Sequence, residues 1–241
     1  MSYTMQYCDE GIEGYKRSKE DIFKSIRTMA ELHHRMHIPT VEYYIEPSLE
    51  NGYLRHKQEV KKIRSFIRKR GASSPFEKIY LATVEDFLRD GEEAYAALRE
   101  SGYQELRRKA ETEGEVCHGE YNQHNVLILK SGTAVTNFEH WGFDTQMADL
   151  YRFMRKILEK YNWDVRFGKE MLKAYHEIKP VSREEWTNLK IRFSYPEKYW
   201  KLANYYYTHR KTWISVKNTE KLQNLIRQRE AWKRYCASFF F

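Results

Sequence analysis

A group of polar residues in the middle of this sequence has the spacing of a site that transfers phosphate. His118-Gly119-Glu120 is followed, five residues after Glu120, by Asn125. This order matches H-x-D-x-x-x-x-N, with glutamate in place of the aspartate. In such sites the carboxylate orients a substrate hydroxyl and accepts its proton, while the amide holds Mg²⁺. The residue types therefore indicate phosphoryl transfer to a hydroxyl group, with Glu120 and Asn125 as candidate catalytic residues.

A second polar group, Asn137-Phe138-Glu139, lies twelve positions after Asn125. Phosphate transfer needs a second acid on a neighbouring strand, where it clamps the metal against the phosphates. Asn125, Asn137 and Glu139 are therefore the candidate metal ligands. An amide gives Mg²⁺ an oxygen but no charge, and hard cations favour carboxylates. Glu139 would share a face with Asn137 only if the strand stays regular that far.

His118 and Glu120 also fit the H-x-E pattern of a zinc deaminase. That chemistry requires a P-C-x-x-C motif further along the chain, because its two cysteines complete the metal site. The sequence contains no such motif. We therefore discard the deaminase hypothesis.

The elements that must position these residues are mostly helices around a small β segment. Val116-Cys117-His118 predicts a short strand, and Val126–Leu129 with Thr133–Thr136 predicts a hairpin about the turn Lys130-Ser131-Gly132. The expected fold class is mainly α with a small β-hairpin insert (α+β). Because no linker or repeat interrupts the chain, residues 1–241 are expected to form a single domain. Apolar periodicity and caps predict helices over 18–37, 54–70, 75–98, 102–110, 147–161, 164–175, from 182, 199–207 and 218–235.

Composition excludes two classes of protein. Of the 241 residues, 15% are aromatic, which is too high a share for a disordered chain. No run of about 18 apolar residues could span a bilayer, so we expect no membrane partner. Cys8, Cys117 and Cys236 form no C-x-x-C pair, and the N-terminus has no apolar export signal. We therefore expect reduced thiols and synthesis in the cytoplasm.

The positive charge is concentrated at the C-terminal end. Residues 198–241 contain ten Lys or Arg and two Glu, which accounts for the whole net charge of +8. Interleaved with Trp and Tyr, such a basic helical segment could bind a polyanion through phosphate contacts and stacking. The simpler alternative is a solvated helical face. No motif that reads DNA or RNA accompanies the charge, so we do not expect a nucleic-acid partner.

Taken together, these motifs resemble a known family. The stretch from Cys117 to Asn162 is similar to the kinase-like branch that includes aminoglycoside phosphotransferases and choline kinases. It resembles more narrowly the CotS-type spore-coat proteins. At the N-terminus, Tyr7-Cys8-Asp9 and Ala30-Glu31-Leu32-His33 resemble that family's hinge and its first C-lobe helix. The segments that carry the resemblance are His118–Leu127, Asn137-Phe138-Glu139, Asp149–Lys156 and Leu158–Trp163.

The resemblance implies the C-terminal lobe of a kinase-like fold and a role for each motif residue. Glu120 falls on the catalytic aspartate, Asn125 on the metal-binding asparagine, and Asn137 on the metal-clamping aspartate. His118 matches a structural histidine of the loop. Asp149 matches a buried aspartate that braces the catalytic loop through backbone contacts.

The chain departs from the family pattern at three points, all of which bear on phosphoryl transfer. The sequence starts at a hinge-like entry, residues 1–17, without a Gly-rich phosphate loop or a strand lysine, so the N-terminal nucleotide lobe is expected to be lacking. Glu120 moves the carboxylate by on the order of 1 Å, which can cost about 10²-fold in rate. Asn137 removes a negative charge from the metal clamp.

The leading hypothesis is therefore a truncated pseudokinase of the spore coat with a structural or binding role. It would need no cofactor, and other spore-coat proteins would be its partners. One alternative is an active phosphotransferase on a sugar or other hydroxyl substrate. That enzyme would use Mg-ATP, Glu120 as base, Asn125 and Glu139 as metal ligands, and a separate chain as nucleotide lobe. The other alternative is a polyanion-binding module formed by residues 198–241.

Overall fold

The structure is a computed structural model that describes residues 18–38, 47–130, 132–208 and 216–239. These residues group into two compact units. The first unit holds the described parts of Met1–Ile45, Leu106–Ile157 and Arg166–Ser182, and the second holds those of Glu46–Glu105, Leu158–Val165 and Arg183–Phe241. The expected single domain over 1–241 stays a prediction, and the hinge-like entry at 1–17 lies outside the described residues.

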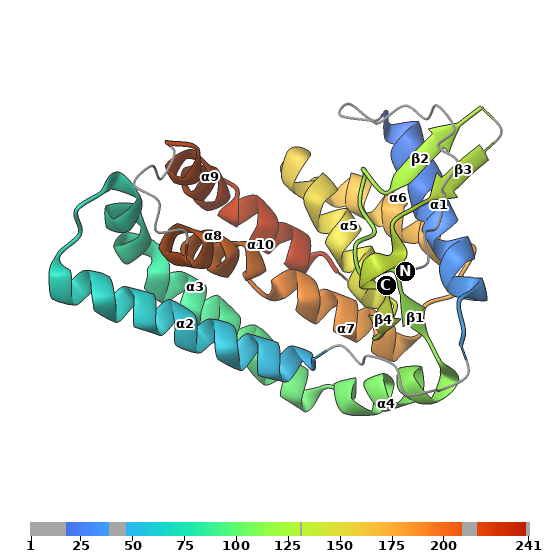
Figure 1. The fold of residues 1–241 in the computed structure, drawn as a ribbon, viewed down its shortest axis with the longest axis horizontal. Coiled ribbons are helices and arrows are strands. Elements are labelled where there is room, and N and C mark those ends of the chain that lie inside the picture. Colours follow the sequence, from blue (N-terminus) through green and yellow to red (C-terminus); the bar gives the residue numbers. More distant parts are fainter. Residues whose placement is uncertain (1–17, 39–46, 131, 209–215, 240–241) are drawn as a thin grey trace, which may run out of the picture. The chain divides into compact units, whose positions relative to one another are not determined.

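The first unit combines four helices with two small antiparallel β pairs (Figure 1). Its helices are α1 (Lys19–Arg35), most of α4 (Tyr103–Glu113), most of α5 (Met147–Lys160) and α6 (Val165–His176). Helix α1 starts where predicted because Ser18 caps it: the Ser18 hydroxyl accepts a hydrogen bond from the Asp21 amide at 3.1 Å. Its apolar stripe is buried as expected, from Ile22 to Ala30.

Strands β2 (Val126–Leu129) and β3 (Gly132–Val135) form the predicted hairpin, with Val126 opposite Val135. The second strand is shifted by one residue from the predicted 133–136. Strand β1 (Val116–Cys117) confirms the short strand predicted over Val116-Cys117-His118 and is one residue shorter. Its antiparallel partner, β4 (Gly142–Phe143), was not predicted. The predicted class, mainly α with a small β-hairpin insert, is confirmed.

The second unit is helical. It contains α2 (Leu49–Arg70), α3 (Pro75–Glu100), the start of α4 (Tyr103–Glu113), α7 (Arg183–Ser194), α8 (Glu197–Thr208), α9 (Val216–Arg227) and α10 (Arg229–Ala237). Helix α2 begins five residues before the predicted Leu54, because the Ser48 hydroxyl caps it by accepting from the Asn51 amide at 3.3 Å.

The prediction of one helix over 218–235 is wrong, because the chain breaks at Gln228 into α9 and α10. Gln228 donates its side-chain amide to the Glu159 carbonyl at 2.9 Å. The break also lets Trp232 donate from its indole nitrogen to the Phe193 carbonyl at 2.7 Å. These distant contacts decide the helix boundary, and local propensity cannot anticipate them.

Stacked aromatic rings form much of the core of the second unit, which explains the high aromatic content. Ring centroids lie 3.5 Å apart for Tyr53 and Tyr195 and 3.4 Å apart for His56 and Trp200. Cys236 here and Cys117 in the first unit are buried and form no disulfide among the described residues, whereas Cys8 lies outside them. No described helix combines the length and the apolar character needed to cross a membrane.

His56 should make the stability of the fold depend on pH. Burial, followed by the charge of Arg55, lowers the pKa of His56 from 6.5 to about 4. The unfolded chain therefore binds a proton that the folded chain refuses, so stability is complete above pH 6.5 and falls as the pH drops toward 4. His56→Phe keeps a ring against Trp200. Between pH 7 and pH 5 we expect its free energy of unfolding to fall by about 1 kcal/mol less than that of the wild type.

Urea unfolding at both pH values measures this difference. His34→Gln is the matched control, since His34 is exposed on α1. Equal pH dependence in the wild type and in His56→Phe would contradict the prediction.

Candidate functional site

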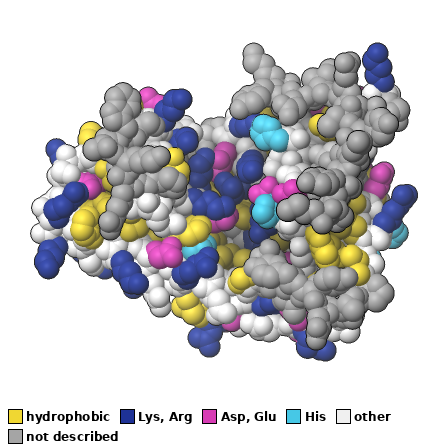
Figure 2. All heavy atoms as spheres, viewed as in Figure 1, with side chains coloured by type: hydrophobic (Ala, Val, Ile, Leu, Met, Phe, Trp, Pro, Cys, Tyr) yellow, Lys and Arg dark blue, Asp and Glu magenta, His cyan; other side chains and the backbone are white. Residues whose placement is uncertain are grey.

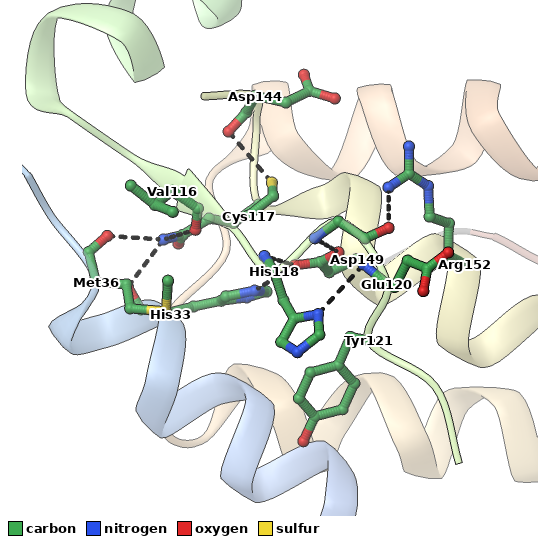
Figure 3. A network of polar contacts seen from close by, with 12 residues as sticks. His33, Met36, Val116, Cys117, His118, Glu120, Tyr121, Asp144, Asp149 and Arg152 are labelled. Carbon is green, nitrogen blue, oxygen red and sulfur yellow. Dashed lines mark hydrogen bonds and ion pairs between the residues drawn. The ribbon is translucent and has the colours of Figure 1, made fainter. Parts of the chain in front are cut away.

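The buried carboxylate of Asp149 binds the backbone of the predicted catalytic loop. Asp149 lies in the first turn of α5 and is completely buried. It accepts hydrogen bonds from the His118 amide at 2.6 Å and from the Gly119 amide at 3.1 Å (Figure 3). The carboxylate thus contacts the loop through its backbone amides.

Helix α1 supplies the partner of this carboxylate. His33 is completely buried, and its Nε2 lies 3.3 Å from Asp149 Oδ2. Its Nδ1 lies 2.7 Å from the Tyr175 hydroxyl of α6. Burial by itself would raise the pKa of the Asp149 carboxyl, but the hydrogen bond and charge of His33, the Arg152 guanidinium and the His118 amide hold it below its usual value. Asp149 is therefore an ionised group matched on several sides.

His118 fastens the loop to the end of the hairpin. Its Nδ1 accepts a hydrogen bond from the Glu120 amide at 3.2 Å, and its Nε2 donates to the Thr136 carbonyl at 2.9 Å. The Phe138 ring packs against the imidazole, with centroids 4.5 Å apart. His118 thus connects the loop to the end of the hairpin, and the structural role implied by the resemblance stays a prediction.

Glu120 and Asn125 belong to one compact turn. The Asn125 side chain donates from Nδ2 to the Glu120 carbonyl at 2.9 Å. The backbone carbonyl of Asn125 in turn accepts from the Thr136 amide at 2.9 Å. The Glu120 carboxylate is about half exposed and lies 3.8 Å from Nε2 of the more exposed His140, so this contact contributes little energy.

The expectation that the second hairpin strand carries Asn137-Phe138-Glu139 is wrong. Strand β3 ends at Val135, Asn137 adopts a left-handed conformation (φ 65°, ψ 62°), and Phe138–His140 form a 3₁₀ turn. Asparagine tolerates this conformation better than most residues. Because the strand does not continue, alternation cannot place Glu139 on the face of Asn137. Within the described residues, no three histidine, cysteine or carboxylate side chains gather as a metal-binding group.

Several residues that support the loop were not singled out from the sequence. Arg152, one turn along α5 from Asp149, donates to the Gly119 carbonyl at 2.5 Å. Gln146 donates to the carbonyls of His33 at 3.0 Å and Val116 at 3.3 Å, which joins α1 to β1. Gly119 has a positive φ of 79°. For these residues, the only local signal in the sequence is that Arg152 lies one helical turn after Asp149.

Comparison with known proteins now identifies the family. Residues 19–239 match the family model described as "Spore coat putative kinase YutH". The chain belongs to this spore-coat family. Spore coat protein S of Bacillus subtilis (strain 168) is 24% identical over 158 residues, which cover 65% of this chain and 45% of that protein. The matched segment thus spans less than half the length of this relative.

The fold of this spore-coat family member is that of kinase-like phosphotransferases. The crystal structure of an aminoglycoside phosphotransferase from Alicyclobacillus acidocaldarius subsp. acidocaldarius DSM 446 superposes with a TM-score of 0.85. The match covers 95% of this chain and 68% of that one, at 16% identity. At that identity the likeness establishes the fold alone, and the expected kinase-like fold is confirmed.

Asp149→Asn should destabilise this member of the spore-coat family strongly. The substitution removes a buried charge and leaves one loop amide without an acceptor, so we expect a loss of about 3 kcal/mol at pH 7. Because the pKa of Asp149 is lowered from 3.8, its contribution is complete above that pH and disappears as the pH falls through the lower folded-state value. Urea unfolding at pH 7 and pH 3 measures both effects.

Tyr175→Phe is the milder companion, since it removes only the hydroxyl that contacts His33 and should cost about 1 kcal/mol. If Asp149→Asn cost no more than Tyr175→Phe at pH 7, the carboxylate would not be the main support of the loop.

Gly119→Ala should also destabilise the protein. A Cβ on Gly119 would lie 1.8 Å from the His140 carbonyl oxygen, and the residue has a positive φ. Both effects are unfavourable, and we expect a loss of about 2–3 kcal/mol. The matched control is Gly102→Ala, where no atom lies within 4 Å of the new Cβ. Thermal unfolding should separate the two variants by several degrees, and equal melting temperatures would contradict the prediction.

Proposed function

We propose that this chain is a spore-coat protein that keeps the kinase-like loop as a structural or binding element and transfers no phosphate by itself. The observation that carries the proposal is the difference between how the loop is held and which side chains it presents. Asp149, with His33 as its partner, and Arg152 bind the loop backbone. Its reacting positions instead carry a longer carboxylate at Glu120 and a neutral amide at Asn137.

The chemistry of these positions supports the proposal. Phosphoryl transfer depends on precise placement of charge rather than on covalent chemistry by the protein. Asn125 donates from Nδ2 to the Glu120 carbonyl, and its Oδ1 is the atom that could bind a cation. Mg²⁺ would then depend on the amide oxygens of Asn125 and Asn137 and on Glu139 as the one charged ligand. Such a donor set is poor in charge for a hard cation.

Family membership supports a place in the spore coat and other coat proteins as partners, after synthesis in the cytoplasm. A binding role fits the rigid support of the loop, because a preformed surface loses little entropy when it binds. The chain would then be a pseudokinase of the coat.

Binding of Mg-ATP tests the proposal. A ligand at 100 times its Kd stabilises a protein by about 2.7 kcal/mol, which corresponds to about 5–10 °C at this chain length. We expect no saturable shift in the melting temperature of the wild type. Glu120→Ala is the matched variant. Because the Glu120 carboxylate is exposed, this variant should have the melting temperature of the wild type both with and without Mg-ATP. A saturable rise of several degrees in the wild type would contradict the proposal.

The fold favours one alternative, an active phosphotransferase on a sugar or other hydroxyl substrate. A separate nucleotide lobe would bring Mg-ATP, and Glu120 would be the base. Phosphate transfer that disappears in Glu120→Ala would support this alternative.

Polyanion binding through residues 198–241 stays a prediction. Internal ion pairs already engage four of the ten basic residues, and Arg210 and Lys211 lie outside the described residues. The engaged residues are Lys198 with Glu159, Lys201 with Glu197, and Arg229 and Lys233 with Asp90.

A further inference from the structure

The charges of the α2–α3 hairpin are sorted by face. Where the two helices meet, opposite charges pair: Arg64 and Arg68 contact Glu85, and Lys57 and Lys61 contact Glu92. These pairs occupy the seam between the helices. The charges left outside the seam are therefore the ones that another molecule would meet.

The outer face of α2 presents two unpaired lysines with an aromatic ring between them. Lys62, Phe66 and Lys69 follow one another at steps of four and three residues, so they form a single stripe. Phe66 is 52% exposed, although its ring also contacts Tyr207. Neither lysine has an ion pair or hydrogen bond within the described part of the chain. In Figure 2 the surface over α2 carries dark blue basic side chains with yellow hydrophobic patches among them.

A complementary stripe with the same spacing lies on α3. Glu93, Ala97 and Glu100 also follow at steps of four and three residues, and all three are exposed. Neither glutamate is paired with another described residue. The stripe forms one wall of a groove of about 430 Å³ between α3, α7 and α10. Its apolar lining includes Ala94, Ile191 and Trp232. Its other charged lining residues are Lys190 and the ion pair of Lys233 with Asp90.

We propose that the stripe Lys62-Phe66-Lys69 of one copy docks into the groove lined by Glu93-Ala97-Glu100 of a second copy. Residues seven apart on a helix are separated by about 10.5 Å along its axis. Lys62 can therefore face Glu93 while Lys69 faces Glu100. In that register Phe66 lies over Ala97 and reaches the apolar lining. The match combines two opposite-charge contacts with burial of an exposed ring.

The contact joins different surfaces of the same chain, so it is heterologous. Such contacts close into rings or continue as open chains of molecules. One helix stripe on one groove falls in the smallest class of interface, so each contact is weak and sensitive to salt. Repetition along an assembly compensates for weak single contacts. This assembly does not depend on whether the catalytic loop binds a nucleotide.

Sedimentation velocity on the full chain tests self-association. In about 50 mM salt the average sedimentation coefficient should rise as the protein is concentrated from about 5 to 200 µM. In about 500 mM salt this rise should largely disappear, because the Debye length falls to a few ångströms. A single monomeric species at the highest concentration in low salt would overturn the proposal.

Reciprocal charge reversal tests the two surfaces. Lys62→Glu with Lys69→Glu makes the stripe acidic, and Glu93→Lys with Glu100→Lys makes the groove basic. Each double variant alone should be monomeric, since its stripe and groove then carry like charges. An equimolar mixture should associate again, because every stripe now meets a groove of opposite charge.

Lys169→Glu with Lys221→Glu is the control. Both lysines are exposed, and the variant changes the net charge by the same amount as the acidic-stripe variant. It should associate like the wild type, and circular dichroism should show unchanged helix content in every variant. Association that survives both reversals, or a mixture that stays monomeric, would overturn the proposal.

Discussion

The buried negative charge of Asp149 is the constraint on which the loop region depends. A completely buried carboxylate is tolerated only when hydrogen bonds and positive charge match it. Two loop amides and His33 provide this match, and Tyr175 holds His33 in turn. Since these partners come from α1, α6 and the loop that follows β1, ionisation of one side chain fixes how three segments of the first unit meet.

This constraint explains how a site can keep its shape while its chemistry changes. Asp149 binds backbone amides of the loop, so these hydrogen bonds do not depend on the side chains at positions 120 and 137. Glutamate and asparagine can therefore occupy these positions without disturbing the hydrogen bonds at Asp149. Phosphoryl transfer depends on those side chains, whereas the fold does not. A kinase-like fold in a spore-coat family is consistent with this separation.

The second unit is stabilised by different means. Its helices share stacked aromatic pairs, and its seams use ion pairs such as Arg64 with Glu85. With the charges that face each other already paired, complementary unpaired charges remain on two outer faces. In the proposed self-association these two faces meet, and the loop His118–Asn125 takes no part in that contact.

Much of this protein follows from its sequence alone. The apolar periodicity and caps determined most helices, as at Ser18 and Pro75, and the hairpin and the polar loop were recognisable because each is formed by neighbours along the chain. The tertiary structure decided the rest. His33 meets Asp149 across 116 residues, Gly119 must be glycine because the His140 carbonyl approaches it, and Gln228 ends α9 through a contact with Glu159. The 3₁₀ turn after Asn137 is likewise packed against His118. Local patterns carry no record of such contacts, because they arise only when distant segments are packed together.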